Sequence, residues 1–203
     1  MGSVRYLLDH ENRGSFFVGA TIFGSMLVGI WATFSWLPTW AQSLSTGDSA
    51  GLREGGNLVI LLGLGGIIGS FFAGFLANGL GRRGALMIAF GGATLAASIL
   101  YLTNSEFTNI IYIQTAFLSL FFGISQAIMT AYIPELFPTS VRSTATGISF
   151  NAGRYVTATA VFFVGVLVPV LGGFGNSLLI FSATYLIGFI TVIFGKETRG
   201  SVL

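Results

Sequence analysis

The sequence contains no cysteine and a single histidine, and only 8% of its residues are charged. Without cysteine there is no disulfide framework and no cysteine-based metal site. Soluble domains contain about 25% charged residues, so the low charge argues against a soluble protein. The basic residues are spread over several short segments and form no stripe, which argues against a nucleic-acid partner. The sequence therefore predicts no metal, no cofactor and no nucleic acid.

Hydrophobic residues make up 53% of the chain, and the mean hydropathy is +0.84. They occur in segments long enough to cross about 30 Å of hydrocarbon as helices, which takes about 20 residues each. The strands of a membrane barrel would be about half that length and would alternate apolar with polar residues. The composition therefore predicts an all-α integral membrane protein that lies in a lipid bilayer.

Six apolar segments follow one another along the chain. The predicted transmembrane helices are residues 16–42, 57–80, 85–103, 108–133, 143–171 and 176–195. A polar loop with Asp48, Arg53 and Glu54 separates the first two. Residues 1–15 and 196–203 are polar ends on either side of a six-helix bundle formed by residues 16–195.

The basic residues indicate how the chain is oriented in the membrane. One side of the bundle has Arg5, Arg13, Arg82, Arg83, Arg142, Lys196 and Arg199, whereas the other has only Arg53. By the positive-inside rule, both termini are then cytoplasmic in a cell membrane. The first and fourth helices start in opposite directions, so we expect two inverted three-helix repeats, which is a common plan of transporters.

Arg154 is the one basic residue that falls inside an apolar segment. A central arginine costs about 2.5 to 3.5 kcal/mol on insertion scales, so its presence suggests a function. Counting from Ser143 at about 1.5 Å per residue puts it near the membrane midplane. We interpret Arg154 as a cation that faces a cavity and attracts an anion or organises an ion pair. The alternative is a structural arginine that bonds to carbonyl groups or reaches the lipid headgroups.

Three predicted helices each have one polar or small face. The faces consist of Thr21, Ser25, Gly29, Ala32 and Trp36 on the first helix, Thr115, Ser119, Gly123, Gln126 and Thr130 on the fourth, and Thr144, Gly147, Asn151, Arg154 and Ala158 on the fifth. In lipid these faces turn inward, where they would surround one polar cavity. The predicted substrate-binding residues are Arg154, Asn151, Gln126, Ser119 and Trp36. The alternatives are that the small and hydroxyl residues serve helix packing, and that Trp36 belongs to an interfacial belt or a gate.

Three short motifs resemble signatures of the major facilitator superfamily. GFLANGLGRR, from Gly74 to Arg83, is similar to the loop motif Gly-x-x-x-Asp-(Arg/Lys)-x-Gly-Arg-(Arg/Lys), with Asn78 in place of the aspartate. PELFPTSVR resembles the Glu-x6-Arg loop between the tenth and eleventh helices, with Glu135 and Arg142 at its matching ends. FGKETRG is similar to the Pro-Glu-Thr-Lys-Gly ending of sugar-porter-like members.

The resemblance implies half of a major facilitator fold, namely the seventh to twelfth helices of a twelve-helix transporter. Residues 1–15 would then be the cytoplasmic end of its central loop. The motifs are similar to those of metabolite:proton symporters that carry organic acids or sugars. The implied partners are a small-molecule substrate and an N-terminal six-helix half or a second copy.

The resemblance also implies a cytoplasmic gate made of Glu135, Arg142, Arg82, Arg83 and Asn78, whose ion pairs break and reform during transport. The alternative is an ordinary solvated pair of loop charges worth less than about 1 kcal/mol.

No aspartate or glutamate lies deep within a predicted helix. If the full transporter is a proton symporter, its proton carrier is therefore expected in the other half. An intramembrane enzyme would need a nucleophile with a base, or paired acids, within the helices, and neither is present. We therefore predict a protein that is not an enzyme and has no catalytic residue. The alternative function is a standalone six-helix protein that acts as a homodimer or as a non-transporting regulatory or scaffold subunit.

Overall fold

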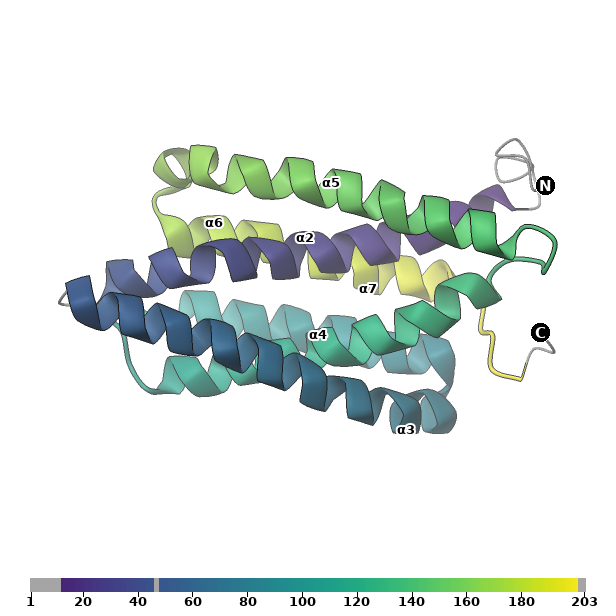
Figure 1. The fold of residues 1–203 in the computed structure, drawn as a ribbon, viewed down its shortest axis with the longest axis horizontal. Helices are drawn as coiled ribbons and strands as arrows, with labels where there is room; N and C mark the ends of the chain where they lie inside the picture. The colour runs from purple at the N-terminus through teal and green to yellow at the C-terminus, as the bar shows by residue number, and fades with distance from the viewer. Residues whose placement is uncertain (1–11, 46–47, 201–203) are drawn as a thin grey trace.

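The computed structural model describes residues 12–45 and 48–200. Residues 1–11, most of the predicted N-terminal cytoplasmic end, and residues 201–203 of the predicted tail lie outside the described residues. The described elements are all helices: α2 (Arg13–Leu44), α3 (Asp48–Leu102), α4 (Ile110–Glu135), α5 (Arg142–Leu171), α6 (Phe174–Ser182) and α7 (Thr184–Phe194). They form one elongated bundle (Figure 1).

Within the described residues, five helical segments are long and apolar enough to cross a membrane. They are Arg13–Leu44, Gly51–Leu102, Ile110–Glu135, Arg142–Leu171 and Phe174–Phe194. The last of these consists of α6 and α7, which are separated only at Ala183. Large apolar side chains such as Phe71, Phe75 and Val170 are exposed on the outside of the bundle, as expected for contact with lipid. The chain is thus a multi-pass membrane protein.

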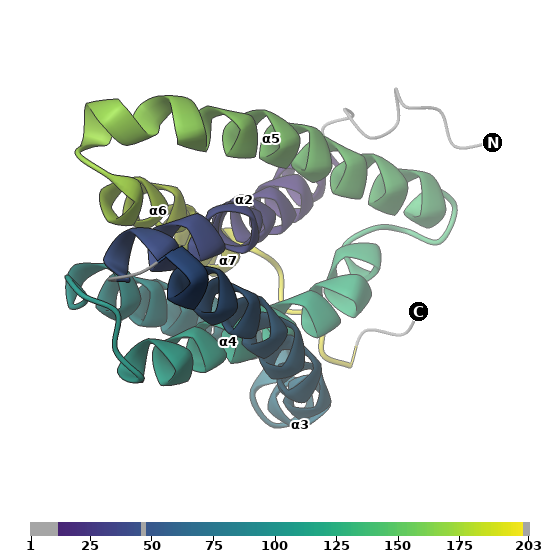
Figure 2. The same ribbon diagram turned by 60° about the vertical axis from the view of Figure 1, so that its left-hand side comes forward.

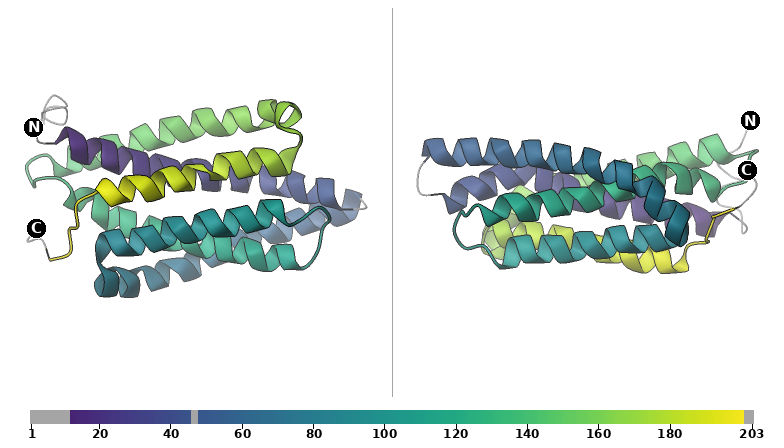
Figure 3. Two further views of the ribbon diagram at one scale, coloured as in Figure 1. Left: turned by 180° about the vertical axis from the view of Figure 1, so that it is seen from behind. Right: turned by 90° about the horizontal axis from the view of Figure 1, so that it is seen from below.

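Helix α3 folds back on itself at Gly81, where φ is 81° and ψ is 170°. A positive φ is costly for a residue with a Cβ atom, and a Cβ here would lie 2.6 Å from a carboxylate oxygen of Glu197. The residues before and after Gly81 form two arms that run in opposite directions (Figure 3). The reversal lies where the sequence predicted the second helix to end.

The predicted loop after the first helix is wrong over most of its length, because α3 already begins at Asp48. The sequence favoured a loop there because the segment is polar and carries Asp48, Arg53 and Glu54. In the structure, Gly51 and Gly55 let α3 lie close to α2. A Cβ on Gly51 would be 2.9 Å from the Cα atom of Gln42, and a Cβ on Gly55 would be 2.9 Å from the Cα atom of Pro38. Close packing against α2 therefore accompanies a helix in this polar segment.

Helix α2 lies in the middle of the bundle, between α5 on one side and α3 with α4 on the other (Figures 1 and 2). Every residue from Ile22 to Ile30 is buried. On α5, by contrast, the buried residues are Ala145, Ser149, Gly153, Thr157 and Val164. Most of them recur at four-residue steps, so α5 buries one face and leaves the other face free.

The connections between helices lie at two ends of the bundle. The start of α2, the reversal at Gly81, the α4–α5 connection and the segment after α7 lie at one end, on the right in Figure 1. The connection from α3 to α4 lies at the opposite end, where the backbone N–H of Phe107 donates to the carbonyl oxygen of Leu44 at 3.1 Å. Arg82, Arg83 and Arg142 therefore share one end of the bundle.

Glycines allow α3 and α4 to approach closely. A Cβ on Gly123 would lie 1.9 Å from the carbonyl oxygen of Gly66, and a Cβ on Gly69 would lie 2.1 Å from that of Leu120. The hydroxyl of Ser70 donates to the carbonyl oxygens of Gly66 and Gly123 at 2.9 and 3.3 Å. Contacts between small residues are a main source of helix association in lipid.

We expect Gly123→Ala to destabilise the protein by at least about 2 kcal/mol, because the added methyl group collides with backbone atoms that cannot rotate away. The measurement is the free energy of unfolding in mixed detergent micelles. Gly63→Ala on α3 is the matched control, since a Cβ there would have no neighbour within 4 Å. Equal stability of the two variants would contradict the close contact between α3 and α4.

Candidate functional site

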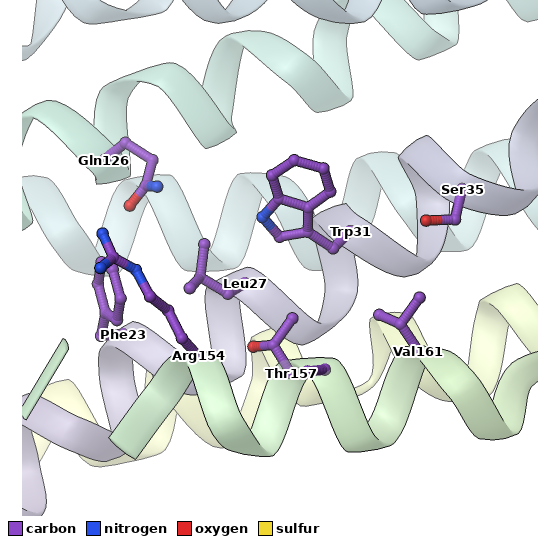
Figure 4. Close-up of a pocket in the computed structure, with 9 residues that line it drawn as sticks. Phe23, Leu27, Trp31, Ser35, Gln126, Arg154, Thr157 and Val161 are labelled. Atoms are coloured by element: carbon purple, nitrogen blue, oxygen red, sulfur yellow. The ribbon is translucent and has the colours of Figure 1, made fainter. Parts of the chain in front are cut away.

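A cavity of about 480 Å³ opens between α2, α4 and α5 (Figure 4). Its lining consists of Phe23, Leu27, Trp31, Ser35, Gln126, Arg154, Thr157, Ala158 and Val161. Most of these side chains are apolar, and a few polar groups converge among them. A cavity of this size and composition is typical of a small-molecule site.

Arg154 and Gln126 meet at one end of the cavity, and their side chains point toward one another (Figure 4). The guanidinium group of Arg154 forms no hydrogen bond or ion pair with any residue that the structure describes. Within the same part of the chain, the buried Oε1 atom of Gln126 also has no hydrogen-bond partner. A guanidinium has five N–H donors in a planar fork that matches a carboxylate. This end of the cavity can therefore bind an anion.

The packing of α5 against α2 determines where Arg154 lies. Gly153, the preceding residue, sits against Gly24 of α2, and a Cβ on Gly24 would be 3.3 Å from the Cα atom of Gly153. Phe150 stacks on Phe23, with ring centroids 4.4 Å apart and an interplanar angle of 22°. Because these contacts fix the rotation of α5, Arg154 projects from the edge of its buried face into the cavity.

Three other predicted substrate-binding residues lie outside the cavity lining. Asn151 is exposed, and its side-chain amide donates to the carbonyl oxygen of Gly147 at 2.8 Å. The hydroxyl of Ser119 is buried between α4 and α3, where it donates to the carbonyl oxygens of Ala116 and Leu61 at 3.0 and 3.3 Å. Trp36 stacks on Phe174, with ring centroids 5.8 Å apart. The structure thus brings Arg154 and Gln126 together, and substrate contacts of the other three remain predictions.

Sequence reasoning missed the α2 wall of the cavity. Phe23, Leu27, Trp31 and Ser35 recur at four-residue steps, so they form one face of α2. This regular spacing was a usable signal. It was overlooked because the neighbouring face has more hydroxyl and small residues, which looked more suitable for a polar cavity.

A second polar cluster lies at the end of the bundle where α3 reverses. The Nη2 atom of Arg82 lies 3.3 Å from Oε1 of Glu135, and its Nε atom donates to Oε2 at 3.4 Å. The hydroxyl of Thr198 also donates to Glu135. This ion pair connects the second arm of α3 to the end of α4.

Glu197 holds the start of the second arm of α3. Its carboxylate accepts hydrogen bonds from the backbone N–H groups of Arg82 and Arg83 at 2.8 and 3.0 Å. It also accepts from the N–H groups of Thr198 and Arg199. Burial raises the pKa of the Glu197 carboxyl, but these four bonds stabilise the charged form more, so the pKa lies below its usual value.

Further bonds attach the segment after α7 to its neighbours. At the end of α7, the carbonyl oxygen of Ile193 accepts a hydrogen bond from Nη2 of Arg83 at 2.6 Å. Nη1 of Arg199 donates to that of Gly79 at 2.9 Å. The hydroxyl of Tyr132 donates to the carbonyl oxygen of Lys196 at 2.8 Å. This segment therefore contacts α3 on both sides of its reversal and also α4.

The structure brings only part of the predicted gate together. Arg82, Arg83 and Glu135 belong to the polar cluster described above. Nε of Arg142 donates to the carbonyl oxygen of Phe137 at 3.3 Å and does not pair with Glu135. Asn78 is exposed and makes no hydrogen bond within the described part of the chain. Sequence reasoning noted the FGKETRG motif but did not predict that Glu197 and Thr198 take part in the cluster.

Comparison with known proteins identifies transporters as relatives. The chain is 31% identical over 196 residues to the cis,cis-muconate transport protein of Acinetobacter baylyi, an alignment that covers 94% of this chain and 45% of that protein. It is 24% identical over 176 residues to the niacin transporter NiaP of the same organism, covering 86% of this chain and 40% of the transporter. The chain thus spans less than half the length of these relatives.

Among solved structures, a double-tryptophan mutant of XylE, the xylose transporter of Escherichia coli, superposes with a TM-score of 0.71 at 18% identity. The superposition covers 98% of this chain and 48% of XylE, and it shows a shared fold. No protein-family profile matches the chain. A further relative is named only as a transporter of the MFS type, that is, of the major facilitator superfamily. The relatives and the fold of the chain agree, and it belongs to the major facilitator superfamily.

Proposed function

We propose that the chain is the C-terminal half of a secondary transporter that moves a small organic anion across the membrane by alternating access. The proposal rests chiefly on the unpartnered guanidinium of Arg154, which lies beside Gln126 in the cavity. A cation within a membrane-spanning helix is energetically costly. Such a residue is therefore interpreted first as part of a functional site. The other six-helix bundle comes from an N-terminal half or from a second copy.

Six membrane crossings are the topology that we propose. A continuous helix from Gly51 to Leu102 would be 52 residues long, which is about 78 Å at 1.5 Å per residue and far exceeds the hydrocarbon thickness. The reversal at Gly81 supports two crossings there, and α6 with α7 supports a single one. Both termini are then cytoplasmic in a cell membrane, on the side of Arg82, Arg83 and Arg142.

An organic acid is the substrate class that we propose. Muconate and niacin, which name the two relatives described above, both contain a carboxylate group. Arginine binds a carboxylate through two parallel N–H···O bonds, which gives both affinity and orientation. Gln126 would donate a hydrogen bond to the same group or to a polar atom beside it. A sugar is the alternative substrate, because the fold is shared with XylE.

In the proposed mechanism, two six-helix bundles rock about a site near the midplane. The Arg82–Glu135 pair and the Glu197 bonds hold the cytoplasmic end of this bundle together. Substrate binding shifts the population between states only if the two states bind the substrate differently. No carboxylate lines the cavity in the described part of the chain, so we place the proton carrier of a coupled cycle in the other bundle.

The topology can be tested by cysteine labelling, since the chain has no cysteine of its own. We expect Ser140→Cys, between α4 and α5, to react with a membrane-impermeant maleimide only from the cytoplasmic side. Ser105→Cys, between α3 and α4, should react only from the opposite side, because α4 crosses the membrane between the two positions. Labelling of both positions from the same side would contradict six crossings.

Arg154→Gln should weaken the binding of muconate or nicotinate by about tenfold or more, because a charge-assisted pair of bonds to the carboxylate is lost. The affinities are measured on the purified protein in lipid nanodiscs, and Arg154→Lys should recover only part of the loss. Arg53→Gln is the matched control, since Arg53 is exposed and does not line the cavity. Unchanged affinity in Arg154→Gln would overturn the proposed anion site.

We expect Arg82→Gln and Glu135→Gln to loosen the cytoplasmic end, since each breaks the same ion pair. The reporter is Ser35→Cys in the cavity lining. It is labelled in right-side-out membrane vesicles from the side opposite the cytoplasmic end. Its labelling rate should fall about two- to fivefold in either variant, because a partly exposed pair contributes up to about 1 kcal/mol. The double variant should fall no further than either single variant. Additive effects would show that the two side chains act separately.

A further inference from the structure

Trp31 is the cavity residue whose ring is most available to a ligand. About half of its surface, 51%, is exposed, although neighbouring positions on α2 are buried. Its aromatic neighbour is Phe34, whose ring is tilted by 41° at a centroid distance of 5.8 Å, so the two rings do not stack face to face. Phe23 at the other end of the cavity differs, since it is only 5% exposed and already stacks on Phe150.

The positions of Trp31 and Arg154 define a direction for a bound molecule. Figure 4 shows Arg154 and Gln126 at one end of the cavity, Trp31 and Ser35 toward the other, and Leu27 between them. Phe23 and Trp31 are eight positions apart on α2, which is about 12 Å along the helix axis. A small acid held at Arg154 by its carboxylate therefore extends past Leu27 toward the indole ring of Trp31.

The shape of the molecule then affects how well it binds. A flat conjugated body can lie against the indole face at stacking distance over its whole area, whereas a puckered saturated body contacts it at only a few atoms. The surrounding side chains of Leu27 and Val161 are aliphatic and favour both bodies similarly. Aromatic stacking is therefore the interaction in this cavity that distinguishes the two shapes.

We infer that the cavity selects planar, conjugated carboxylates, and that Trp31 is the residue that determines this specificity by stacking on the body of the ligand. The inference rests on the proposed function, because it requires the carboxylate to lie at Arg154. It adds that the charge of the ligand and its shape are recognised by different residues on different helices, Arg154 on α5 and Trp31 on α2.

The test compares benzoate with cyclohexanecarboxylate, which have the same charge and the same number of carbon atoms but a flat and a puckered ring. Dissociation constants are measured by ligand-observed NMR on the purified protein in lipid nanodiscs. We expect the wild type to prefer benzoate by about three- to tenfold. Trp31→Leu should bind both acids equally, whereas Trp31→Phe should keep most of the preference because it retains an aromatic face.

Phe17→Leu is the matched control, because Phe17 is an exposed aromatic residue on the same helix that does not line the cavity. It should keep the wild-type preference. Thermal unfolding of each variant shows whether the protein is folded. If Trp31→Leu does not fold, Trp31→Phe still tests the role of the aromatic face.

Each contrary outcome overturns a different statement. If both acids bind equally to the wild type and Arg154→Gln weakens both, the role of Trp31 is wrong and the anion site stands. If Trp31→Leu is folded but binds neither acid, Trp31 shapes the cavity and does not select planar ligands. If neither acid binds to the wild type although muconate does, the specificity inference fails and the anion site stands; if muconate does not bind either, both fail.

Discussion

The cavity depends on the contact between α2 and α5, where Gly24 faces Gly153. A Cβ at Gly24 would be 3.3 Å from the Cα atom of Gly153, so a larger residue at this position would push the helices apart. In lipid, apolar side chains gain little by leaving their surroundings, and close backbone approach supplies much of the attraction between helices. Arg154 follows Gly153 directly. The same contact that holds α5 in place therefore positions the cation of the proposed substrate site, and any movement of α5 against α2 would move that cation.

The described charges fall into two arrangements with different consequences. At the end of the bundle, Arg82 is paired with Glu135, and Glu197 accepts backbone hydrogen bonds, so these groups stabilise one arrangement of α3, α4 and the final segment. In the cavity, Arg154 has no partner among the described residues. Arg154 is exposed, so its guanidinium is accessible to a bound anion. A transporter needs both arrangements, since one end must open and close while the site stays able to bind.

Particular residues show how far sequence reasoning reached. The sequence placed the end of the second predicted helix at Gly81, Arg82 and Arg83, and the structure reverses α3 at this glycine. Gln126 and Arg154 were placed in one cavity because both are costly in lipid and therefore turn inward. Periodicity did not show that Ser119 lies between α4 and α3, because a repeating face of small and polar residues does not reveal which neighbouring helix it contacts. The loop predicted around Asp48, Arg53 and Glu54 was wrong over most of its length, because α3 begins at Asp48 and packs closely on α2 at Gly51 and Gly55.

The sequence by itself determined that the chain is helical and lies in a membrane, because hydropathy is a local property that can be read along the chain. It also contained the motifs of the major facilitator superfamily. Only the tertiary structure decided that Arg82 pairs with Glu135, 53 positions away, and that Glu197 holds the start of the second arm of α3, more than a hundred positions away. It also decided that Trp31 faces the cavity. These contacts depend on how each helix is rotated against its neighbours, which is set by the close packing of small residues in three dimensions.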